Sequence, residues 1–399
     1  MAEKRLVVIA YQINSKRGSE YSVAWNFLRY MSQIKSFEMI FGTTGNHLGH
    51  LDECIEDYKR LFPNIKFTYK TPSSYALAIN YLNRIGLIRP VFYLAYRRWL
   101  FEVSNYIKKN KDEIKHVHFL NPIGFREPGY LYNLGIPYTW GPIGGMNNPN
   151  KLLLNDIKIN ERIFWFLRRK INDINSSNRR VGLTLKNATN VFTISKEMKA
   201  AFSKIVAREY IVLPENGMTM RPAPKSISRS QKYLELVWVG DSSKRKNLQL
   251  LLQACDKCTS NISLNIVGVS GENYSKKNCR FRYSGRVPRS EITRILKEGD
   301  LLVVTSLSEG NPTVIWEAYE SSTPVLSLDH CGMSDTVIPE SGWLLPISSS
   351  LASDLALAID QIAEDRADLV RKTDWIFNNA YDKFAWTNRI SKFLTCYEG

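Results

Sequence analysis

The stretch from Asp300 to Asp329, DLLVVTSLSEGNPTVIWEAYESSTPVLSLD, predicts the architecture of the domain around it. It begins with a short apolar, β-branched run, which is typical of a strand buried on both faces. Asn311 is expected to cap the helix that follows, with Pro312 as its first residue, because an N–H at that position would have no partner. A second apolar run follows the helix. This order of strand, helix and strand predicts a right-handed βαβ unit.

Two glutamates flank the expected helix start. Glu309 precedes it, and Glu317 lies about 9 Å along the helix at ~1.5 Å per residue. A helix start after a parallel strand attracts anions, because its free N–H groups and its dipole point at the ligand. In one interpretation a diphosphate binds the amides of Gly310 and Asn311, and the carboxylates accept hydrogen bonds from sugar and ribose hydroxyls. In the other, Glu309 is a loop residue near the dipole and Glu317 lies on a solvated helix face; these residues alone favour neither.

Strand and helix patterns alternate in two successive series, with a stretch rich in Pro, Ser and basic residues between them. Two such series predict an α/β protein with two Rossmann-like, doubly wound domains that face a cleft. The expected boundaries are 1–214 for the first domain, 215–232 for the linker, 233–375 for the second domain, and 376–399 for a C-terminal helix that packs back on the first domain.

Length and composition are those of an ordinary globular protein. The 399 residues suffice for two domains with sizeable cores, and 44% of them are apolar. No apolar run reaches the ~18 residues that span a bilayer, and the N-terminal one is too short for a signal peptide. The six cysteines are sparse and irregularly spaced, which predicts a reduced, cytoplasmic protein. Cys255 and Cys258 form a C-x-x-C pair without a second pair of ligands, so both are expected to be structural residues of a helix.

The formal charge of +16 is compatible with nucleic acid, an anionic membrane surface or a phosphate-rich substrate as a partner. No zinc finger, RNA-binding signature or basic zipper is visible, so nucleic acid is not expected. Residues 83–101 and 161–172 mix Arg and Lys with aromatic and aliphatic residues, as helices on a bilayer surface do. Amphipathic packing with basic edges is the alternative. The expected membrane contacts are Arg97, Arg98, Trp99, Arg168 and Arg169.

The motifs, in their order and spacing, resemble glycosyltransferase family 4, retaining enzymes of the GT-B fold. TSLSEGNPTVIWEAYESSTPVLSLDHCGMSD (305–335) resembles the E-x7-E segment of that family, and LVWVGDSSKRKNLQLLLQA (236–254) resembles the opening of its second domain. RGSEYSVAWNF (17–27), HFLNPIGFREPGYLYNLGIPYTWGPIGG (118–145) and ENGM (215–218) are similar to a bacterial branch that builds surface polysaccharides. The resemblance covers nearly the whole chain.

The resemblance implies that the second domain binds a nucleotide-sugar donor. Glu309 would hold the hydroxyls of the donor sugar, and Glu317 would hold the ribose. Lys246 would neutralise the diphosphate as it leaves, a role that suits a point charge. The further residues that the resemblance places at the nucleotide sugar are Arg245, Arg286, Gly310, Asn311, Pro312 and Thr313.

In the first domain the resemblance implies three glycines at the donor or acceptor and one histidine at the reacting sugar. The glycines are Gly18, Gly144 and Gly145, which lack a Cβ and would let their loops approach the substrates. His116 and His118 alternate on an expected strand, so one of them faces the cleft, and the resemblance favours His118 as a catalytic residue. The alternatives to these roles are that the glycines only form turns and that the histidine is a hydrogen-bonded core residue.

One position departs from the pattern of the family. Asp241 stands directly after the glycine of the VG turn, where the family often has an arginine on the phosphates. A carboxylate cannot bind a diphosphate, so either Arg245 supplies the missing charge or the phosphate site is weaker.

The implied activity is transfer of a hexosyl or deoxyhexosyl group, with retention, from a nucleotide sugar to a hydroxyl of a lipid-linked glycan acceptor in O-antigen, capsule or exopolysaccharide biosynthesis. No D-x-D motif is visible, so no metal and no other cofactor is expected, the nucleotide sugar being a substrate. The protein is expected in the cytoplasm, on the inner face of the cell membrane. Another GT-B activity, such as nucleotide-sugar epimerisation, and a non-catalytic membrane- or nucleic-acid-binding protein on this scaffold are the alternatives.

Overall fold

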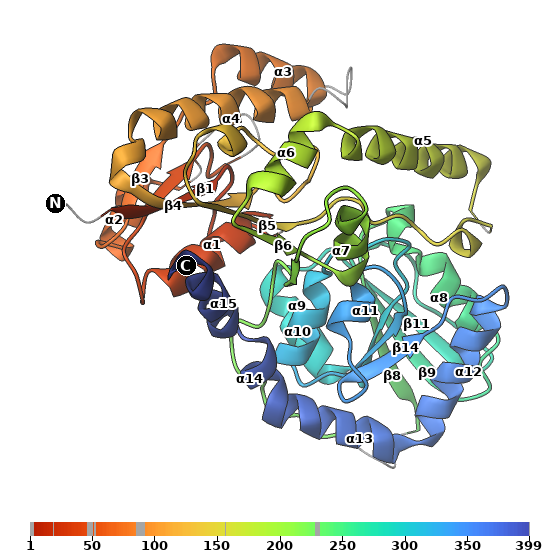
Figure 1. Cartoon of the computed structure of the whole chain (residues 1–399). Coiled ribbons are helices and arrows are strands. Elements are labelled where there is room, and N and C mark those ends of the chain that lie inside the picture. The colour runs from red at the N-terminus through yellow and green to blue at the C-terminus, as the bar shows by residue number, and fades with distance from the viewer. Residues whose placement is uncertain are drawn as a thin grey trace. The chain divides into compact units, whose positions relative to one another are not determined.

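The computed structural model describes residues 4–18, 20–45, 51, 53–84, 92–155, 157–227 and 232–398 (Figure 1). The chain divides into two compact units. Unit 1 comprises Met1–Met146, Leu167–Glu215 and Arg389–Gly399, and unit 2 comprises Asn147–Phe166 and Asn216–Asn388.

The described residues of unit 1 form a seven-stranded parallel sheet in the order β3-β2-β1-β4-β5-β6-β7. Its strands are β1 Arg5–Ala10, β2 Glu38–Phe41, β3 Lys66–Tyr69, β4 Ile114–Asn121, β5 Tyr138–Ile143, β6 Asn190–Thr193 and β7 Ile211–Val212. The helices between them are α1 Glu20–Met31, α2 Ile55–Leu61, α3 Ser74–Arg84, α4 Phe92–Lys109, α5 Ile159–Ser176, α6 Arg179–Asn187 and α7 Lys196–Ser203. Helix α5 crosses the boundary, since its residues up to Phe166 belong to unit 2. The central strands β1 and β4 are almost entirely buried, as parallel strands covered by helices are.

The described residues of unit 2 form a second seven-stranded sheet in the order β10-β11-β9-β8-β12-β13-β14, in which β10 alone is antiparallel to its neighbour. Its strands are β8 Leu234–Val239, β9 Ile262–Val267, β10 Tyr274–Lys276, β11 Cys279–Gly285, β12 Leu301–Val304, β13 Val325–Leu328 and β14 Gly342–Leu345. Its helices are α8 Leu248–Cys255, α9 Arg289–Glu298, α10 Thr313–Glu320, α11 Met333–Thr336, α12 Leu351–Glu364, α13 Arg366–Trp375 and α14 Tyr381–Phe384. The predicted doubly wound α/β architecture is thus confirmed in each unit, and so is the βαβ unit β12–α10–β13.

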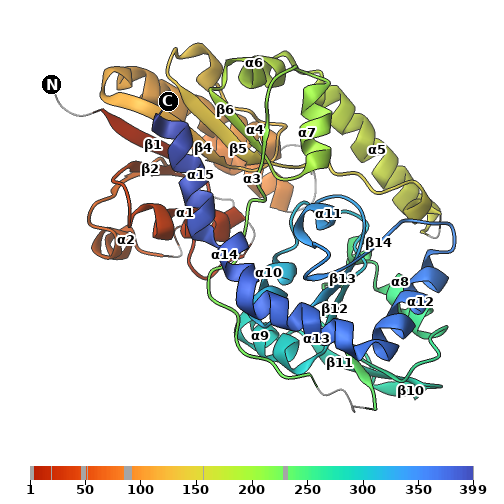
Figure 2. The same ribbon diagram turned by 60° about the horizontal axis from the view of Figure 1, so that its bottom comes forward.

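Helix packing fixes the core of unit 2. Helix α12 packs beside α8, and α10 packs beside α9 (Figure 2). Trp238, Leu251, Ile315 and Tyr319 are buried in this core, and burying such a side chain stabilises the fold by about 1.5–3 kcal/mol. Cys255 and Cys258 lie in the same core with free thiols, which agrees with the structural role predicted for them. Only Cys255 is on the helix, because α8 ends there and Cys258 lies in the turn that follows.

The unit boundaries differ from the predicted domain boundaries at residues 147–166, which belong to unit 2 although the sequence places them in the first domain. The physical reason is specific bonding: Asn147 donates to the carbonyl of Glu309, and Leu153 lies in the unit 2 core. The predicted linker is also packed against unit 2, because the Glu320 carboxylate accepts hydrogen bonds from Thr219 and Met220. Residues 228–231 of that linker lie outside the described residues.

The C-terminal region is helical from α12 onward, with a π-helical turn at Ile376–Ala380 and an extended residue at Ala385 before α15 Trp386–Glu398. The chain passes from unit 2 to unit 1 at Arg389, rather than at 376. In unit 1 the ring of Phe393 contacts those of Phe27, His118 and Phe192. None of the helices in the described ranges is both long enough and apolar enough to cross a bilayer.

Candidate functional site

A cationic turn follows β8 in unit 2. After Gly240 the chain forms a short 3-10 helix, Lys244–Lys246, and Asn247 takes a left-handed backbone conformation with φ 51° before α8 begins. The turn is bonded to the loop after β12: the Leu307 N–H donates to the carbonyl of Arg245 (2.7 Å), and the Thr305 hydroxyl donates to that of Asn247 (2.9 Å). The lysine and arginine side chains of the turn are therefore held at the carboxyl edge of the sheet.

Arg245 and Lys246 converge on the carboxylate of Glu309. The Lys246 ammonium lies 2.7 Å from Glu309 Oε1, and the Arg245 guanidinium forms a second ion pair with the same oxygen. Arg245 also donates to the carbonyl of Ser308 at 3.3 Å. Two neighbouring cations and one anion thus meet at one point, and this geometry favours the interpretation in which Arg245 supplies the charge missing at Asp241.

The start of α10 lies in the same loop system. The helix begins at Thr313 with Pro312 at its N-cap position, and no side chain caps it. The expected capping by Asn311 is therefore wrong, because its amide is engaged elsewhere: it accepts from the Trp316 indole (2.8 Å) and donates to the carbonyl of Asn216. The uncapped first turn leaves its N–H groups and the positive end of the dipole for an anionic ligand.

The loop that contains Glu309 and Gly310 is pressed against residues 331–332. A Cβ on Gly332 would lie 1.5 Å from the Gly310 carbonyl oxygen, and the Gly332 N–H donates to the Glu309 carbonyl at 3.0 Å. His330 fixes the same loop through the Ser306 carbonyl (3.1 Å). Glu309 is therefore presented on a rigid support.

Glu317 lies one turn into α10 and pairs with Arg289, at 2.9 Å. Burial raises the pKa of the Glu317 carboxyl, while Arg289 and Lys246 lower it. Arg289, the first residue of α9, is a site residue that the sequence did not reveal, because nothing in its local pattern shows that α9 and α10 are neighbours.

We expect Glu317→Ala to weaken nucleotide binding by about 10-fold or more, since a hydrogen bond to a charged group contributes roughly 1.5–3 kcal/mol. Turnover at saturating donor should change less. Arg289→Ala should weaken binding in the same direction, because the buried carboxylate loses its counter-ion. Titration calorimetry with the nucleotide measures both, and Glu291→Ala, which removes an exposed ion pair on α9, is the control. Unchanged affinity in Glu317→Ala would remove it from the donor site.

Two further predicted residues follow strands at the same edge of the sheet. Arg286 is exposed and directly follows β11, whose carboxyl end lies at the same edge of the sheet. Asp241 accepts a hydrogen bond from the Ser243 N–H (3.0 Å) and another from its hydroxyl. The hydrogen bonds from Ser243, together with Arg245 and Lys246, hold the pKa of Asp241 below its usual range. Asp241 thus shapes the turn.

The predicted residues of unit 1 have different surroundings. His118 does not face a substrate: it is fully buried, its Nδ1 pairs with the Tyr397 hydroxyl, and its Nε2 lies 2.7 Å from the Gly141 carbonyl oxygen. The expectation of a catalytic His118 is contradicted, because α15 covers this face of β4, and burial lowers the pKa of His118 to about 3. Gly18 is exposed before α1. A Cβ on Gly144 would lie 2.6 Å from the Ile194 side chain, and Gly145 has a φ of +101°.

Glu20 is a titratable residue that the sequence analysis overlooked. It opens α1, and its carboxylate accepts a hydrogen bond from the Ile123 N–H (3.2 Å) just beyond β4. Burial raises its pKa to about 7, against the lowering effect of that hydrogen bond. Glu20 belongs to the RGSE stretch of the sequence. Burial of the Glu20 carboxylate could not be predicted from that stretch, because it depends on residues about a hundred positions away.

This pKa gives a pH dependence. In the unfolded chain Glu20 ionises near pH 4.3, whereas in the folded chain it keeps its proton up to about pH 7. Its contribution to stability is therefore fully present below pH 4.3 and is lost as the pH rises through 7. We expect Glu20→Gln to be more stable than the wild type by roughly 2–4 kcal/mol at pH 8 and by about 1 kcal/mol or less at pH 5. Urea unfolding at both pH values measures this, with Glu364→Gln as an exposed control; an equal difference at both pH values would contradict the assigned pKa.

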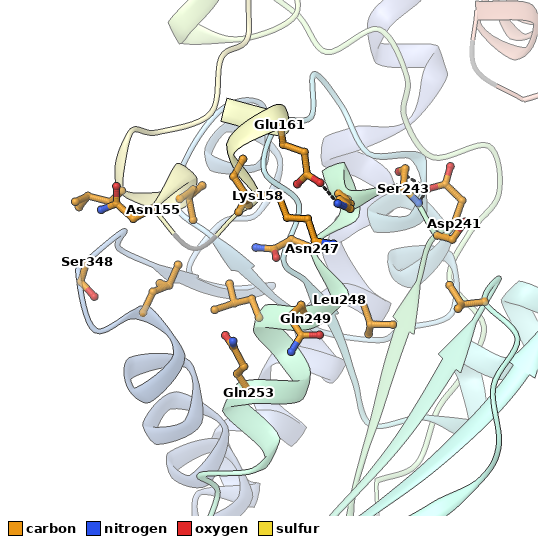
Figure 3. Close-up of a pocket in the computed structure, with 18 of the residues that line it drawn as sticks. Asn155, Lys158, Glu161, Asp241, Ser243, Asn247, Leu248, Gln249, Gln253 and Ser348 are labelled. Atoms are coloured by element: carbon orange, nitrogen blue, oxygen red, sulfur yellow. Dashed lines mark hydrogen bonds and ion pairs between the residues drawn. The ribbon is translucent and has the colours of Figure 1, made fainter. Parts of the chain in front are cut away.

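A pocket of about 670 Å³ in unit 2 adjoins the cationic turn (Figure 3). Its lining includes Asp241, Lys244 and Asn247 from the turn, and Gln249 and Gln253 from α8. Glu161 of α5 reaches into it and pairs with Lys244. Arg245, Lys246 and the two glutamates of the charged cluster are not among its lining residues. The pocket is therefore lined in part by the cationic turn, but it is separate from the charged cluster of Arg245, Lys246, Glu309 and Glu317.

The predicted membrane contacts of α4 are engaged within the protein. Trp99 is fully buried and donates its indole N–H to the Lys70 carbonyl (2.9 Å). Arg97 forms a two-point contact with Glu127, and Arg98 pairs with Glu102. The expectation that Trp99 meets a membrane is wrong, because the apolar side of α4 packs on the sheet. Residues 85–91 of the predicted stretch lie outside the described residues.

Comparison with known proteins finds a family match within the second half of the chain. Residues 221–381 match the family model described as Glycosyl transferases group 1. Over 93 residues the chain is 33% identical to the amylovoran biosynthesis glycosyltransferase AmsK of Erwinia amylovora. That match covers 22% of this chain and 22% of AmsK, so the chain spans about a fifth of that relative's length in the aligned region.

Solved structures show the same fold over nearly all of the chain. The lipopolysaccharide outer core galactosyltransferase WaaB, in its apo form, has a TM-score of 0.61 at 13% identity, with 98% of each chain covered. HepE of Anabaena, in complex with UDP-glucose, has a TM-score of 0.58 at 14% identity, with 98% of this chain and 99% of HepE covered. These likenesses confirm the predicted GT-B fold. The narrower assignment to family 4 stays a prediction.

Proposed function

We propose that this chain, whose residues 221–381 form a glycosyl transferases group 1 domain, is a glycosyltransferase that moves a sugar from a nucleotide-sugar donor to a hydroxyl of a glycan acceptor. The observation that carries the proposal is the convergence of Arg245 and Lys246 on Glu309, beside the uncapped start of α10. This arrangement suits a diphosphate whose charge grows as it leaves and a sugar whose hydroxyls need a carboxylate.

The proposed roles follow from charge. The donor diphosphate displaces Glu309 from the two cations, and the freed carboxylate accepts hydrogen bonds from the donor sugar. Glu317 holds the ribose. The acceptor oxygen bonds to C1 as the bond from C1 to the diphosphate breaks, and the hydroxyl proton passes to the departing phosphate oxygen on the same face of the ring. The configuration at C1 is thereby retained, and protein cations take the place of a metal ion.

The acceptor and the location of the enzyme are inferred from its relatives. AmsK is named for amylovoran biosynthesis and WaaB for the lipopolysaccharide outer core, which supports a role in polysaccharide biosynthesis. Growing bacterial glycans of this kind are expected on lipid carriers, so we propose a lipid-linked acceptor and peripheral attachment to the inner face of the cell membrane. HepE was solved with UDP-glucose, which makes UDP-sugars the first donors to test.

Release of nucleotide from a panel of nucleotide sugars, with and without a glycolipid acceptor extract, tests this function. We expect release with one donor, dependent on acceptor and unaffected by EDTA, and NMR of the product should show the anomeric configuration of the donor. An altered donor without release would indicate an epimerase. Absence of both release and nucleotide binding would indicate a non-catalytic protein.

A further inference from the structure

Helix α5 exposes an unusual number of large apolar side chains. Between 47% and 71% of the surface of each of seven such residues is accessible to solvent. Soluble chains rarely leave a contiguous apolar surface of this kind without a binding partner. The seven residues are Ile159, Ile163, Phe164, Phe166, Leu167, Ile171 and Ile174.

These residues share one face of the helix. Because α5 is one continuous helix of 18 residues, its own geometry of 3.6 residues per turn sets their positions, and they fall within an arc of about 160°. The opposite side carries Trp165 and Asn172, which are both buried. The apolar face of this amphipathic helix is therefore directed away from the protein.

The polar contacts of α5 lie on its other side. Glu161 pairs with Lys244 of the cationic turn, on the side of the helix away from the apolar face. Near the other end, Asn172 donates to the Gly145 carbonyl (3.3 Å) and accepts from Arg126. By the geometry of the helix, Glu161 and Asn172 both lie on the side opposite the apolar face, so these contacts leave that face uncovered.

The charges around the apolar face are mostly positive. Arg162 and Lys170 are exposed on α5, and Arg168 and Arg169 are half-buried, against the two acidic residues Glu161 and Asp173. Glu161 is already neutralised by Lys244. By the same helix geometry Asn160 and Lys170 fall within the apolar arc, and Arg162 lies beyond one edge of it, next to the exposed Asp173. The exposed charge at this face is therefore positive by one. An apolar face with an excess of positive charge complements a surface that is apolar inside and anionic at its edge, and anionic phospholipids provide such a surface.

We propose that α5 is the membrane-docking element of this protein and lies in the plane of an anionic bilayer with its apolar face inserted. At ~1.5 Å per residue the helix is about 27 Å long, enough for a stable interfacial contact but too polar on one side to span the membrane. The inference rests on the membrane attachment proposed above and names its surface. It moves that surface from Arg97, Arg98 and Trp99 to the exposed residues of α5, and Arg168 and Arg169 lie behind them.

Co-sedimentation of the full chain with vesicles tests the docking surface. Vesicles of phosphatidylcholine alone are compared with vesicles containing phosphatidylglycerol. We expect the triple variant Phe164→Asn, Leu167→Asn, Ile171→Asn to bind anionic vesicles at least about 10-fold more weakly. The matched control Leu61→Asn, Met220→Asn, Leu357→Asn alters side chains that are similarly exposed elsewhere and should bind like the wild type. Both triples leave the net charge unchanged, so a difference between them reports apolar insertion.

The double variant Arg162→Gln, Lys170→Gln tests the charge. It should lose about fivefold in affinity per removed charge on anionic vesicles and change little on neutral ones. Equal vesicle binding by the α5 triple and the wild type would overturn the inference while leaving membrane attachment intact. No binding by the wild type would overturn both. The wild type could instead sediment as a dimer and the α5 triple variant as a monomer, with the same vesicle binding in both. That result would show that a second copy of the chain, and not a membrane, covers the apolar face. Stabilisation by nucleotide, measured on every variant, reports the donor site separately.

Discussion

Lys246→Ala is expected to lower turnover about 100- to 1,000-fold, the loss typical of removing one charge-stabilising donor from an active site. Lys246 Nζ lies 2.7 Å from Glu309 Oε1, and its side chain is largely buried. The diphosphate carries more negative charge when the glycosidic bond breaks than when it is bound, so a fixed cation stabilises the transition state more than the ground state. Affinity for the donor should fall less than turnover.

Arg245→Ala should lower turnover as well, because the guanidinium shares Glu309 with Lys246 and stands in for the arginine that Asp241 replaces. Its side chain is more exposed, so we expect the smaller loss. Lys244→Ala, one residue earlier in the turn, is the control, because its side chain pairs with Glu161 instead. Asp241→Ala should leave activity intact or raised. Wild-type turnover in Lys246→Ala, or an inactive Asp241→Ala, would refute the assigned roles.

Glu309→Gln is expected to lower turnover about 100-fold while nucleotide binding stays the same or tightens. Without a ligand, the Glu309 carboxylate occupies both cations and so competes with the diphosphate for them. Glutamine removes this competition, which favours nucleotide, but it cannot supply the negative charge that faces the developing positive charge of the sugar ring. Turnover should therefore fall without any loss of affinity for the nucleotide.

Steady-state kinetics and calorimetry on the same preparation separate these effects. Glu309→Asp, which keeps the charge on a shorter side chain, should recover part of the turnover. If Glu309→Gln weakened nucleotide binding and left turnover unchanged, Glu309 would be a nucleotide ligand and its assignment to the sugar would fail.

The parts of the fold that local patterns determine could be predicted. The βαβ unit β12–α10–β13 follows from two apolar β-branched runs and a helix between them, and the structure has it. The juxtaposition of Lys246 and Glu309 was reached only through the resemblance, because it depends on which strands are neighbours. The wrong cap shows the limit of local reasoning: Asn311 is a good cap by type, but the buried Trp316 indole and the Asn216 carbonyl compete for its amide.

Longer-range packing accounts for the remaining differences. His118 lies on β4, but α15, more than 250 residues later, covers it through Tyr397. Arg289 pairs with Glu317 because α9 lies beside α10, which no spacing in the sequence reveals. The basic and aromatic stretches of α4 and α5 look alike in sequence, yet Trp99 is buried while Phe164 and Phe166 are exposed. Which face of an amphipathic helix meets the protein depends on the partners of that helix.

Donor binding at the charged cluster is tested most directly by thermal unfolding in the presence of UDP-, GDP-, dTDP- and CMP-sugars. A ligand that binds only the folded chain raises its unfolding temperature, by an amount that grows with the ratio of concentration to dissociation constant. We predict that one class of nucleotide sugar at millimolar concentration raises the unfolding temperature of the wild type, and that the rise is much smaller in Lys246→Ala and Glu317→Ala. An absence of any rise in the wild type, or an equal rise in all three proteins, would contradict a nucleotide-sugar site at Lys246, Glu309 and Glu317.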